Sequence, residues 1–392
     1  MKNAGFSVIR QKLMEKLEIS RELSDDEVLN EIDELVLRQD GISLKDKFDL
    51  RQALFYSVRK LDVLQELLVD DEVSEIMVNG PDSIFIEKKG HLTKWEKQFT
   101  SKEKLEDVIQ QIVGRCNRVV NESMPIVDAR LEDGSRINAV IHPVALDGPI
   151  LTIRKFPKEI ITMEKLIEWG SITMECAEFL KELVGCRYSI MIGGGTGSGK
   201  TTFLGALTDY IPKDERIITI EDNAELRLIG IENLVRMEAK TANTDKSNSI
   251  TIRDLIRSAL RMRPDRIIVG EVRGGECFDM LQALNTGHDG SMSTAHANSC
   301  ADMLNRIMMM TRMGIDLPLD AIREQIASGI DIMVHLGRLR DKSRRVLEVT
   351  EVIGCKDGEI IMNPLYCRDH SRGLVRKGEL IHREKLLGRR NV

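Results

Sequence analysis

The sequence predicts an α/β protein whose second half carries a doubly wound sheet. Two observations support this fold class. Between about residues 163 and 360, short apolar runs alternate with stretches that have helical periodicity. A glycine-rich loop also stands at the junction between one apolar run and the helical stretch after it. In the preceding part of the chain, a helical region is followed by a region of shorter periods, which predicts a small α+β domain.

The first two predicted regions are a helical region and a small α+β domain. From Phe6 to about Val69 the apolar residues recur at helical spacing, and Ser24-Asp25-Asp26-Glu27 has the pattern of a helix N-cap. This predicts a helical region over 1–68, in which the acidic stretch 21–40 is a solvated helix face or a docking surface. The α+β domain is predicted over 69–158, with strands at 73–80, 83–87, 135–141 and 150–154 and a helix through 105–112.

The largest domain is predicted over 163–367, after a linker at 159–162. Its strands are expected at 189–192, 216–220, 233–236, 267–269, 290–294 and 332–336, and its helices at 200–210, 250–262, 275–286, 299–312 and 319–329. The chain then ends in a basic tail, 368–392. We expect a solvated, disordered end there, in preference to a segment that contacts a partner or an acidic membrane surface.

The glycine-rich loop has the pattern of a phosphate-binding loop. Successive backbone N–H groups in such a loop point inward at a phosphate, and the helix that follows adds its free N-terminal donors. Lys200 would reach the β- and γ-phosphates, and the Thr201 hydroxyl would hold Mg²⁺. We therefore predict a nucleoside-triphosphate site, in preference to a glycine-rich turn with an incidental lysine, formed by Gly194, Gly195, Thr196, Gly197, Ser198, Gly199, Lys200, Thr201 and Thr202.

Three further predicted strands end in residues that could act on a phosphate. Ile218-Thr-Ile-Glu221-Asp222, Arg266-Ile-Ile-Val-Gly270-Glu271 and Ser293-Thr-Ala-His296 each finish with an acid or a histidine. Taken singly, an acid after a strand is often a helix cap and a lone histidine is often structural. Because all three ends follow the phosphate loop in one βα series, we expect them to meet in one crevice.

Arginines form the other notable group. Most of those at 253, 257, 261, 263, 266 and 273 are expected to be solvated or paired with nearby acids. Arg136, Arg154 and Arg236 lie in or beside predicted strands, where a long cation needs a specific partner. A well-placed arginine accelerates phosphoryl transfer by roughly 10³–10⁵.

Bulk properties limit the classes of function. The 392 residues are 42% hydrophobic and 31% charged, and we find no apolar stretch long enough to cross a bilayer. We therefore expect no direct membrane insertion, and any membrane association to go through a protein partner. The seven cysteines form no C-x-x-C pair, which is typical of reduced thiols in a cytoplasmic protein. The net charge of −6 argues against nucleic acid as a main ligand.

These motifs together resemble the secretion ATPases of type II and type IV secretion and type IV pilus systems, and most of all the CpaF-type ATPases of the Tad pilus. The resemblance runs from about Leu61 to Gly354. It includes the phosphate loop and the segments 75–80, 133–138, 219–226, 260–273, 285–290 and 294–298.

The resemblance implies a RecA-like P-loop motor domain preceded by a PAS-like domain, assembled as a homo-hexamer. It implies that Glu221 belongs to an Asp box and Glu271 to an atypical Walker B element, with His296 as a γ-phosphate sensor. Of the two glutamates, we expect Glu221 to polarise water and Glu271 to order Mg²⁺. Arg136, Arg154 and Arg236 would approach the nucleotide across domains or subunits.

By this resemblance, the chain is expected to be a Mg²⁺-dependent ATP hydrolase that powers a Tad-type pilus through a polytopic inner-membrane platform protein. Three alternatives stay open: the export ATPase of a type IV secretion apparatus, a nucleotide-dependent scaffold with little turnover, and a DNA translocase. The net charge disfavours the translocase.

Overall fold

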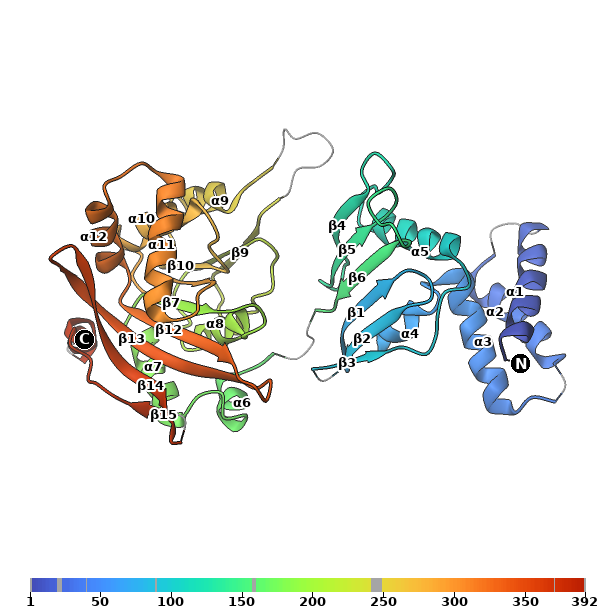
Figure 1. Cartoon of the computed structure of the whole chain (residues 1–392), viewed down its shortest axis with the longest axis horizontal. Helices are drawn as coiled ribbons and strands as arrows, with labels where there is room; N and C mark the ends of the chain where they lie inside the picture. The colour runs from blue at the N-terminus through green and yellow to red at the C-terminus, as the bar shows by residue number, and fades with distance from the viewer. Residues whose placement is uncertain are drawn as a thin grey trace. The chain divides into compact units, whose positions relative to one another are not determined.

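A computed structural model describes residues 2–19, 23–39, 41–88, 90–156, 160–240, 249–369 and 371–390. The chain divides into two compact units, Met1–Lys158 and Glu159–Val392 (Figure 1). Part of the expected linker at 159–162 lies outside the described residues. The finer division of the first unit at residue 68/69 stays a prediction. Among the described residues, no helix is long and apolar enough to span a bilayer.

The first unit begins with helices, as the periodicity predicts. They are α1 (Lys2–Ile19), α2 (Asp25–Leu37), α3 (Leu44–Arg59) and α4 (Leu64–Val69). The Ser24 hydroxyl accepts a hydrogen bond from the Glu27 N–H, and the Glu27 carboxylate accepts one from the Ser24 N–H, so the capping box forms as expected. Val28, Ile32 and Leu54 are fully buried in a core of these helices alone. Much of the acidic stretch is paired rather than simply solvated, as in the contacts Lys16–Glu31 and Arg51–Asp33.

The rest of the first unit is a six-stranded antiparallel sheet in the order β3-β2-β1-β6-β5-β4, with one long helix. Its second core lies between the sheet and this helix, where Ile76, Ile109 and Ile153 are fully buried. Strands β3 and β4 were missed by sequence reasoning, because their alternation is short or weak. The elements are β1 (Val73–Asn79), β2 (Ile84–Lys88), β3 (His91–Lys94), α5 (Lys102–Arg115), β4 (Ile126–Arg130), β5 (Arg136–Val140) and β6 (Ile150–Arg154).

The second unit is built on a nine-stranded sheet in the order β15-β14-β13-β12-β7-β11-β10-β8-β9. All six strands expected here are present, and they form the parallel part of the sheet. They are β7 (Ile190–Gly194), β8 (Ile217–Glu221), β9 (Leu234–Glu238), β10 (Arg266–Val269), β11 (Met292–Ala295) and β12 (Ile332–Arg338). Three antiparallel strands that the sequence did not predict extend one edge: β13 (Arg344–Lys356), β14 (Glu359–Asp369) and β15 (Gly373–Arg376).

Helices cover both faces of this sheet, which confirms the doubly wound α/β class (Figure 1). Adjacent residues of one strand alternate between the two cores: Ile190 and Ile192 pack into one, and Met191 packs into the other. On the first face lie α6 (Met163–Glu168), α7 (Met174–Gly185) and α8 (Lys200–Thr208). On the second lie α9 (Ile252–Ala259), α10 (Glu276–Leu284), α11 (Cys300–Gly314) and α12 (Leu319–Gly329).

The expectation of a solvated, disordered C-terminal tail was wrong for its described residues. Residues 373–376 form β15, and helix α13 (Glu384–Arg390) follows. The Lys385 ammonium lies 2.7 Å from the Asp331 carboxylate, and the Tyr188 hydroxyl donates a hydrogen bond to the His382 carbonyl at 2.6 Å. Basic composition suggested solvent, but Lys385 pairs with Asp289 and Asp331 from distant parts of the chain.

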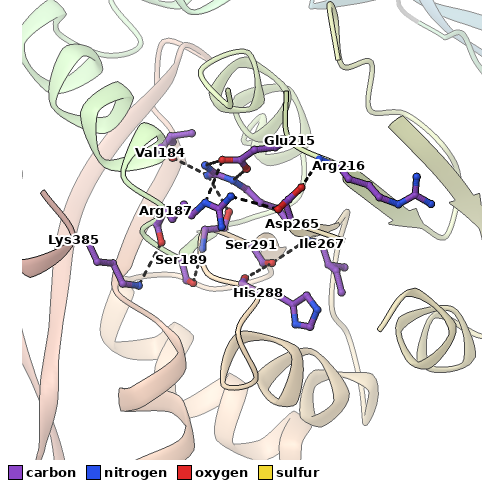
Figure 2. A network of polar contacts seen from close by, with 12 residues as sticks. Val184, Arg187, Ser189, Glu215, Arg216, Asp265, Ile267, His288, Ser291 and Lys385 are labelled. Atoms are coloured by element: carbon purple, nitrogen blue, oxygen red, sulfur yellow. Dashed lines mark hydrogen bonds and ion pairs between the residues drawn. The ribbon is translucent and has the colours of Figure 1, made fainter. Parts of the chain in front are cut away.

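A buried ion pair holds the amino-terminal ends of the central strands, away from the phosphate loop. The Arg266 side chain is fully buried, and its Nε and Nη2 donate to the two oxygens of Glu215 at 2.5 and 3.0 Å. Its Nη1 donates to the Val184 carbonyl at 2.7 Å. Figure 2 shows the surrounding network, in which Arg187 contacts both Glu215 and Asp265. Sequence reasoning had grouped Arg266 with arginines that are solvated or paired, and the structure shows it paired.

Candidate functional site

The glycine-rich loop connects β7 to α8, so the expected strand–loop–helix order is present. Gly197 and Gly199 have φ values of +70° and +91°, which L side chains rarely adopt, and Gly199 is the N-cap of α8. A Cβ atom at Gly194 would lie 2.6 Å from the Leu336 carbonyl oxygen. The loop therefore needs glycine for backbone conformation at two positions and for close packing at a third.

Lys200 is the first residue of α8, and its side chain turns back over the loop. The Nζ donates to the carbonyls of Gly194 at 3.1 Å and Gly195 at 3.2 Å. Burial lowers the pKa of the Lys200 ammonium, while the charge of Glu271 opposes this shift. The ammonium therefore lies over the loop and at the N-terminus of α8, an arrangement suited to a phosphate.

Residues from two further strand ends meet at this lysine. Glu271 follows β10, and its Oε1 lies 3.8 Å from the Lys200 Nζ. His296 follows β11, and its Nε2 lies 3.0 Å from the same Glu271 oxygen. The His296 Nδ1 is 3.4 Å from the Lys200 Nζ. The carboxyl ends of adjacent parallel strands thus gather a lysine, a glutamate and a histidine, as the βα order predicts.

The contacts of His296 fix its tautomer. An ammonium can only donate, so the Nδ1 that faces Lys200 accepts, and the proton of the neutral ring is placed on Nε2, which lies 3.0 Å from Glu271 Oε1 without hydrogen-bond geometry to it. Burial lowers the pKa of the imidazole, with the charges of Glu271 and Lys200 acting in opposite directions. His296 is therefore neutral at pH 7 and presents one donor and one acceptor.

Glu221 closes β8 but contacts neither Lys200 nor His296 directly in the described hydrogen bonds and ion pairs. Its Oε2 accepts hydrogen bonds from the N–H groups of Glu225 at 2.8 Å and Leu226 at 2.9 Å. The side chain is only 3% exposed, and Oε1 has no hydrogen-bond partner among the described residues. Burial raises the pKa of this carboxyl, although the two N–H groups and the charge of Arg236 oppose the shift.

Gly270 makes room for Glu221. A Cβ atom at Gly270 would lie 2.9 Å from the Glu221 Cγ, closer than real Cβ contacts. The sequence had shown only that glycine precedes the strand-end acid Glu271. The structure gives the reason, because the Glu221 side chain from β8 passes over the Gly270 backbone beside β10.

Sequence reasoning missed one residue of this site. Arg273 had been grouped with solvated or paired arginines, yet its Nε donates to the Glu271 Oε2 at 2.8 Å and its Nη2 does so at 2.5 Å. Its Nη1 also lies 3.6 Å from Asp222. Its position two residues after a strand-end acid was the available signal.

The expected site arginines lie in two places. Arg236 is exposed on β9, the edge strand of the second sheet, where it is in register with Thr219. Arg136 and Arg154 belong to the first unit, where they are direct cross-strand partners on β5 and β6. Arg130 on β4 is the cross-strand partner of Arg136 on its other side, and sequence reasoning did not single it out. Three guanidinium groups therefore stand in one row on one face of the sheet.

The residues at the loop fit a Mg²⁺ ion accompanied by a phosphate. Mg²⁺ takes oxygen ligands and is bound by one or two carboxylates together with phosphate oxygens and waters. The Thr201 hydroxyl and the Glu271 carboxylate supply such oxygens, and Glu221 adds a buried oxygen without a hydrogen-bond partner. Within the described residues, no three His, Cys, Asp or Glu side chains gather as a cage that could hold a metal alone.

These features define a P-loop α/β nucleotide-binding protein. The profile of the family described as "Type II/IV secretion system protein" matches residues 59–381. The type IV secretion system protein PtlH of Bordetella pertussis is 32% identical over 317 residues, which span 74% of this chain and 93% of PtlH. The conjugal transfer protein TrbB of Rhizobium radiobacter is 32% identical over 309 residues, which span 76% of this chain and 91% of TrbB.

The chain therefore belongs to the type II/IV secretion system ATPase family. Solved structures agree on the fold. The pilus retraction motor PilT has a TM-score of 0.53 at 21% identity, over 84% of this chain and 86% of its own. The ATPase DotB of Legionella pneumophila has a TM-score of 0.51 at 21% identity, over 74% of this chain and 79% of its own. The sequence-based assignment to this family is confirmed, and the CpaF subtype stays a prediction.

Proposed function

We propose that the protein is a Mg²⁺-dependent ATP hydrolase that works as a homo-hexameric motor. The observation that carries this proposal is the convergence of Lys200, Glu271 and His296 from three adjacent strand ends at a phosphate loop. The family supports nucleotide binding as a general property. A scaffold that only binds nucleotide would not need an acid and a neutral histidine arranged around the loop lysine.

In this proposal each residue has a distinct task. The N–H groups of the loop and the Lys200 ammonium bind the β- and γ-phosphates. Thr201 and Glu271 would hold Mg²⁺, which supplies positive charge to the phosphate oxygens. Glu221, whose Oε1 has no hydrogen-bond partner and whose pKa burial raises, accepts the proton of the attacking water. His296 senses the γ-phosphate through its contacts with Lys200 and Glu271.

The row Arg130, Arg136 and Arg154 supports a second part of the proposal. The three arginines gather positive charge in register on adjacent strands, next to Glu75 of β1, which is in register with Arg154, and such a row attracts an anion. We infer that Arg136 and Arg154, together with Arg236, approach nucleotide phosphates across domains or subunits. Turnover would then require an assembled ring.

The work performed is proposed to be assembly or retraction of a Tad-type pilus, through a polytopic inner-membrane platform protein and from the cytoplasmic side. Support comes from the sequences of the motifs and from the long N-terminal extension. This extension consists of helices α1–α3, which lie almost entirely before the family match that begins at residue 59. The alternative is an export ATPase of a type IV secretion apparatus. The similarity to PtlH and TrbB favours that alternative.

Steady-state ATP turnover by the purified full chain tests the enzymatic proposal. We expect turnover that rises cooperatively with protein concentration and is lost in Lys200→Ala and Glu271→Gln. Lys181→Ala serves as the control, because Lys181 is a surface lysine of the same unit with 52% of its side chain exposed. Nucleotide binding without turnover at every concentration would contradict the proposal and leave a scaffold.

A deletion strain separates the two kinds of machine. For the pilus role, we expect surface pili to disappear in electron micrographs and to return with the wild-type gene but not with Lys200→Ala. Intact pili together with lost export of protein or DNA would instead establish the type IV secretion alternative.

A further inference from the structure

We propose that Arg273 is a positioning residue that orients Glu271 for the metal–phosphate site. This inference rests on the proposed function and deepens it. Both Arg273 contacts go to a single oxygen of Glu271, since Nε and Nη2 lie 2.8 and 2.5 Å from Oε2. The other oxygen, Oε1, faces Lys200 and His296. Arg273 therefore holds the carboxylate through Oε2 and leaves Oε1 directed toward Lys200 and His296.

Arg273 is itself held in place from two sides. Its Nη1 lies 3.6 Å from Asp222, the residue that follows Glu221 at the end of β8. Its backbone N–H donates to the Glu276 carboxylate at 2.6 Å, at the start of α10. The guanidinium thus bridges the ends of β8 and β10, the two strands that carry the site glutamates. A planar group with donors in a fixed geometry is suited to this role, and a flexible ammonium is not.

The position of Arg273 argues against a purely structural ion pair. Its side chain is 59% exposed, and exposed pairs contribute little to folding stability. Glu271, in contrast, is only 16% exposed, so its orientation depends on its few contacts. Loss of Arg273 would therefore leave the fold intact and free the carboxylate to rotate. Misplacement of a reacting group by about 1 Å can reduce a rate about 10²-fold.

The metal itself provides a test that does not need turnover. Removing a positive charge near a cation site should tighten cation binding if electrostatics alone matters. If Arg273 orients Glu271, its removal should weaken binding instead, because the ligand is no longer held in place. The two explanations predict opposite signs.

The experiment compares full-length wild type with Arg273→Ala, Arg273→Lys and Arg383→Ala. Arg383 is the matched control, since it is 51% exposed and pairs with Glu379 far along the chain from the site motifs. Mn²⁺ affinity in the presence of ADP is measured by electron paramagnetic resonance, alongside ADP affinity, melting temperature and kcat. For Arg273→Ala we expect Mn²⁺ affinity to fall about 10-fold or more, as for other outer-shell partners. We also expect a kcat about 10–100-fold lower, with the affinity for ADP in the absence of metal unchanged within about twofold.

Arg273→Lys should recover part of both losses, because it keeps the charge but not the planar donor pair. Unchanged or tighter Mn²⁺ binding in Arg273→Ala would overturn the proposal. So would a large drop in melting temperature that the control does not show. If wild type binds Mn²⁺ and ADP but hydrolyses no ATP, the proposed hydrolysis fails while the Mn²⁺ comparison still tests Arg273.

Discussion

Replacement of Arg266 by methionine should destabilise the second unit strongly. Arg266 is the first residue of β10, whereas the phosphate loop follows the carboxyl end of β7, so this effect does not involve the site. The guanidinium makes two short hydrogen bonds to Glu215 and two to the carbonyls of Val184 and Gly290. Methionine would fill much of the volume but donate nothing. Among the described residues, the Glu215 carboxylate, whose side chain is 8% exposed, would then keep only its contact with Arg187 at 3.2 Å.

The expected cost follows from burial. Breaking a buried pair by removing one partner costs about 3–5 kcal/mol, since the remaining charge is left without compensation. For a unit of this size, that corresponds to a melting temperature lowered by about 6–20 °C. Arg187→Met is the matched control: Arg187 binds the same carboxylate but is 44% exposed, so its loss should cost only about 0–1 kcal/mol.

Differential scanning calorimetry of the full-length variants measures both values. A double variant, Glu215→Leu with Arg266→Met, should be more stable than Arg266→Met alone, because it also removes the orphaned carboxylate. Equal melting temperatures for Arg266→Met and Arg187→Met would refute the argument that burial makes the Arg266–Glu215 pair important for stability (Figure 2).

Two further predictions concern Glu221. Gly270→Ala places a Cβ atom 2.9 Å from the Glu221 Cγ, so turnover should fall about 10-fold or more while ADP affinity persists. Gly205→Ala is the control, since the atom nearest to its new Cβ would be 3.9 Å away. Normal turnover in Gly270→Ala would contradict this packing argument. Glu221→Gln should abolish turnover yet raise the melting temperature at neutral pH. Because burial raises the pKa of Glu221 above its ordinary 4.5, wild type loses stability as pH rises through that raised pKa, and glutamine does not. Melting temperatures of the variant and the wild type are compared between about pH 4 and 8, and the stability gain of the variant should vanish near pH 4. A gain that is independent of pH would exclude the raised pKa of Glu221 as its cause.

Much of the fold was determined by local sequence. The six parallel strands were predicted because each is a short apolar run, and α2 because Ser24 and Glu27 form a capping box within four residues. The phosphate loop was equally clear, since Gly197, Gly199 and Lys200 act through the backbone of their own segment. The convergence of Glu271 and His296 on Lys200 followed from strand order.

Tertiary structure decided what depends on partners distant in sequence. Nothing local to Gly270 indicates that the Glu221 side chain, 49 residues earlier, occupies the space above it. Likewise the basic tail is folded because Lys385 meets Asp331, and Arg266 is buried because Glu215 and Val184 surround it. Charge and periodicity report a residue's own preference for water or for an apolar surface. They cannot report which opposite charge the fold will bring to it, and that contact decides whether an arginine such as Arg273 is solvated or part of the site.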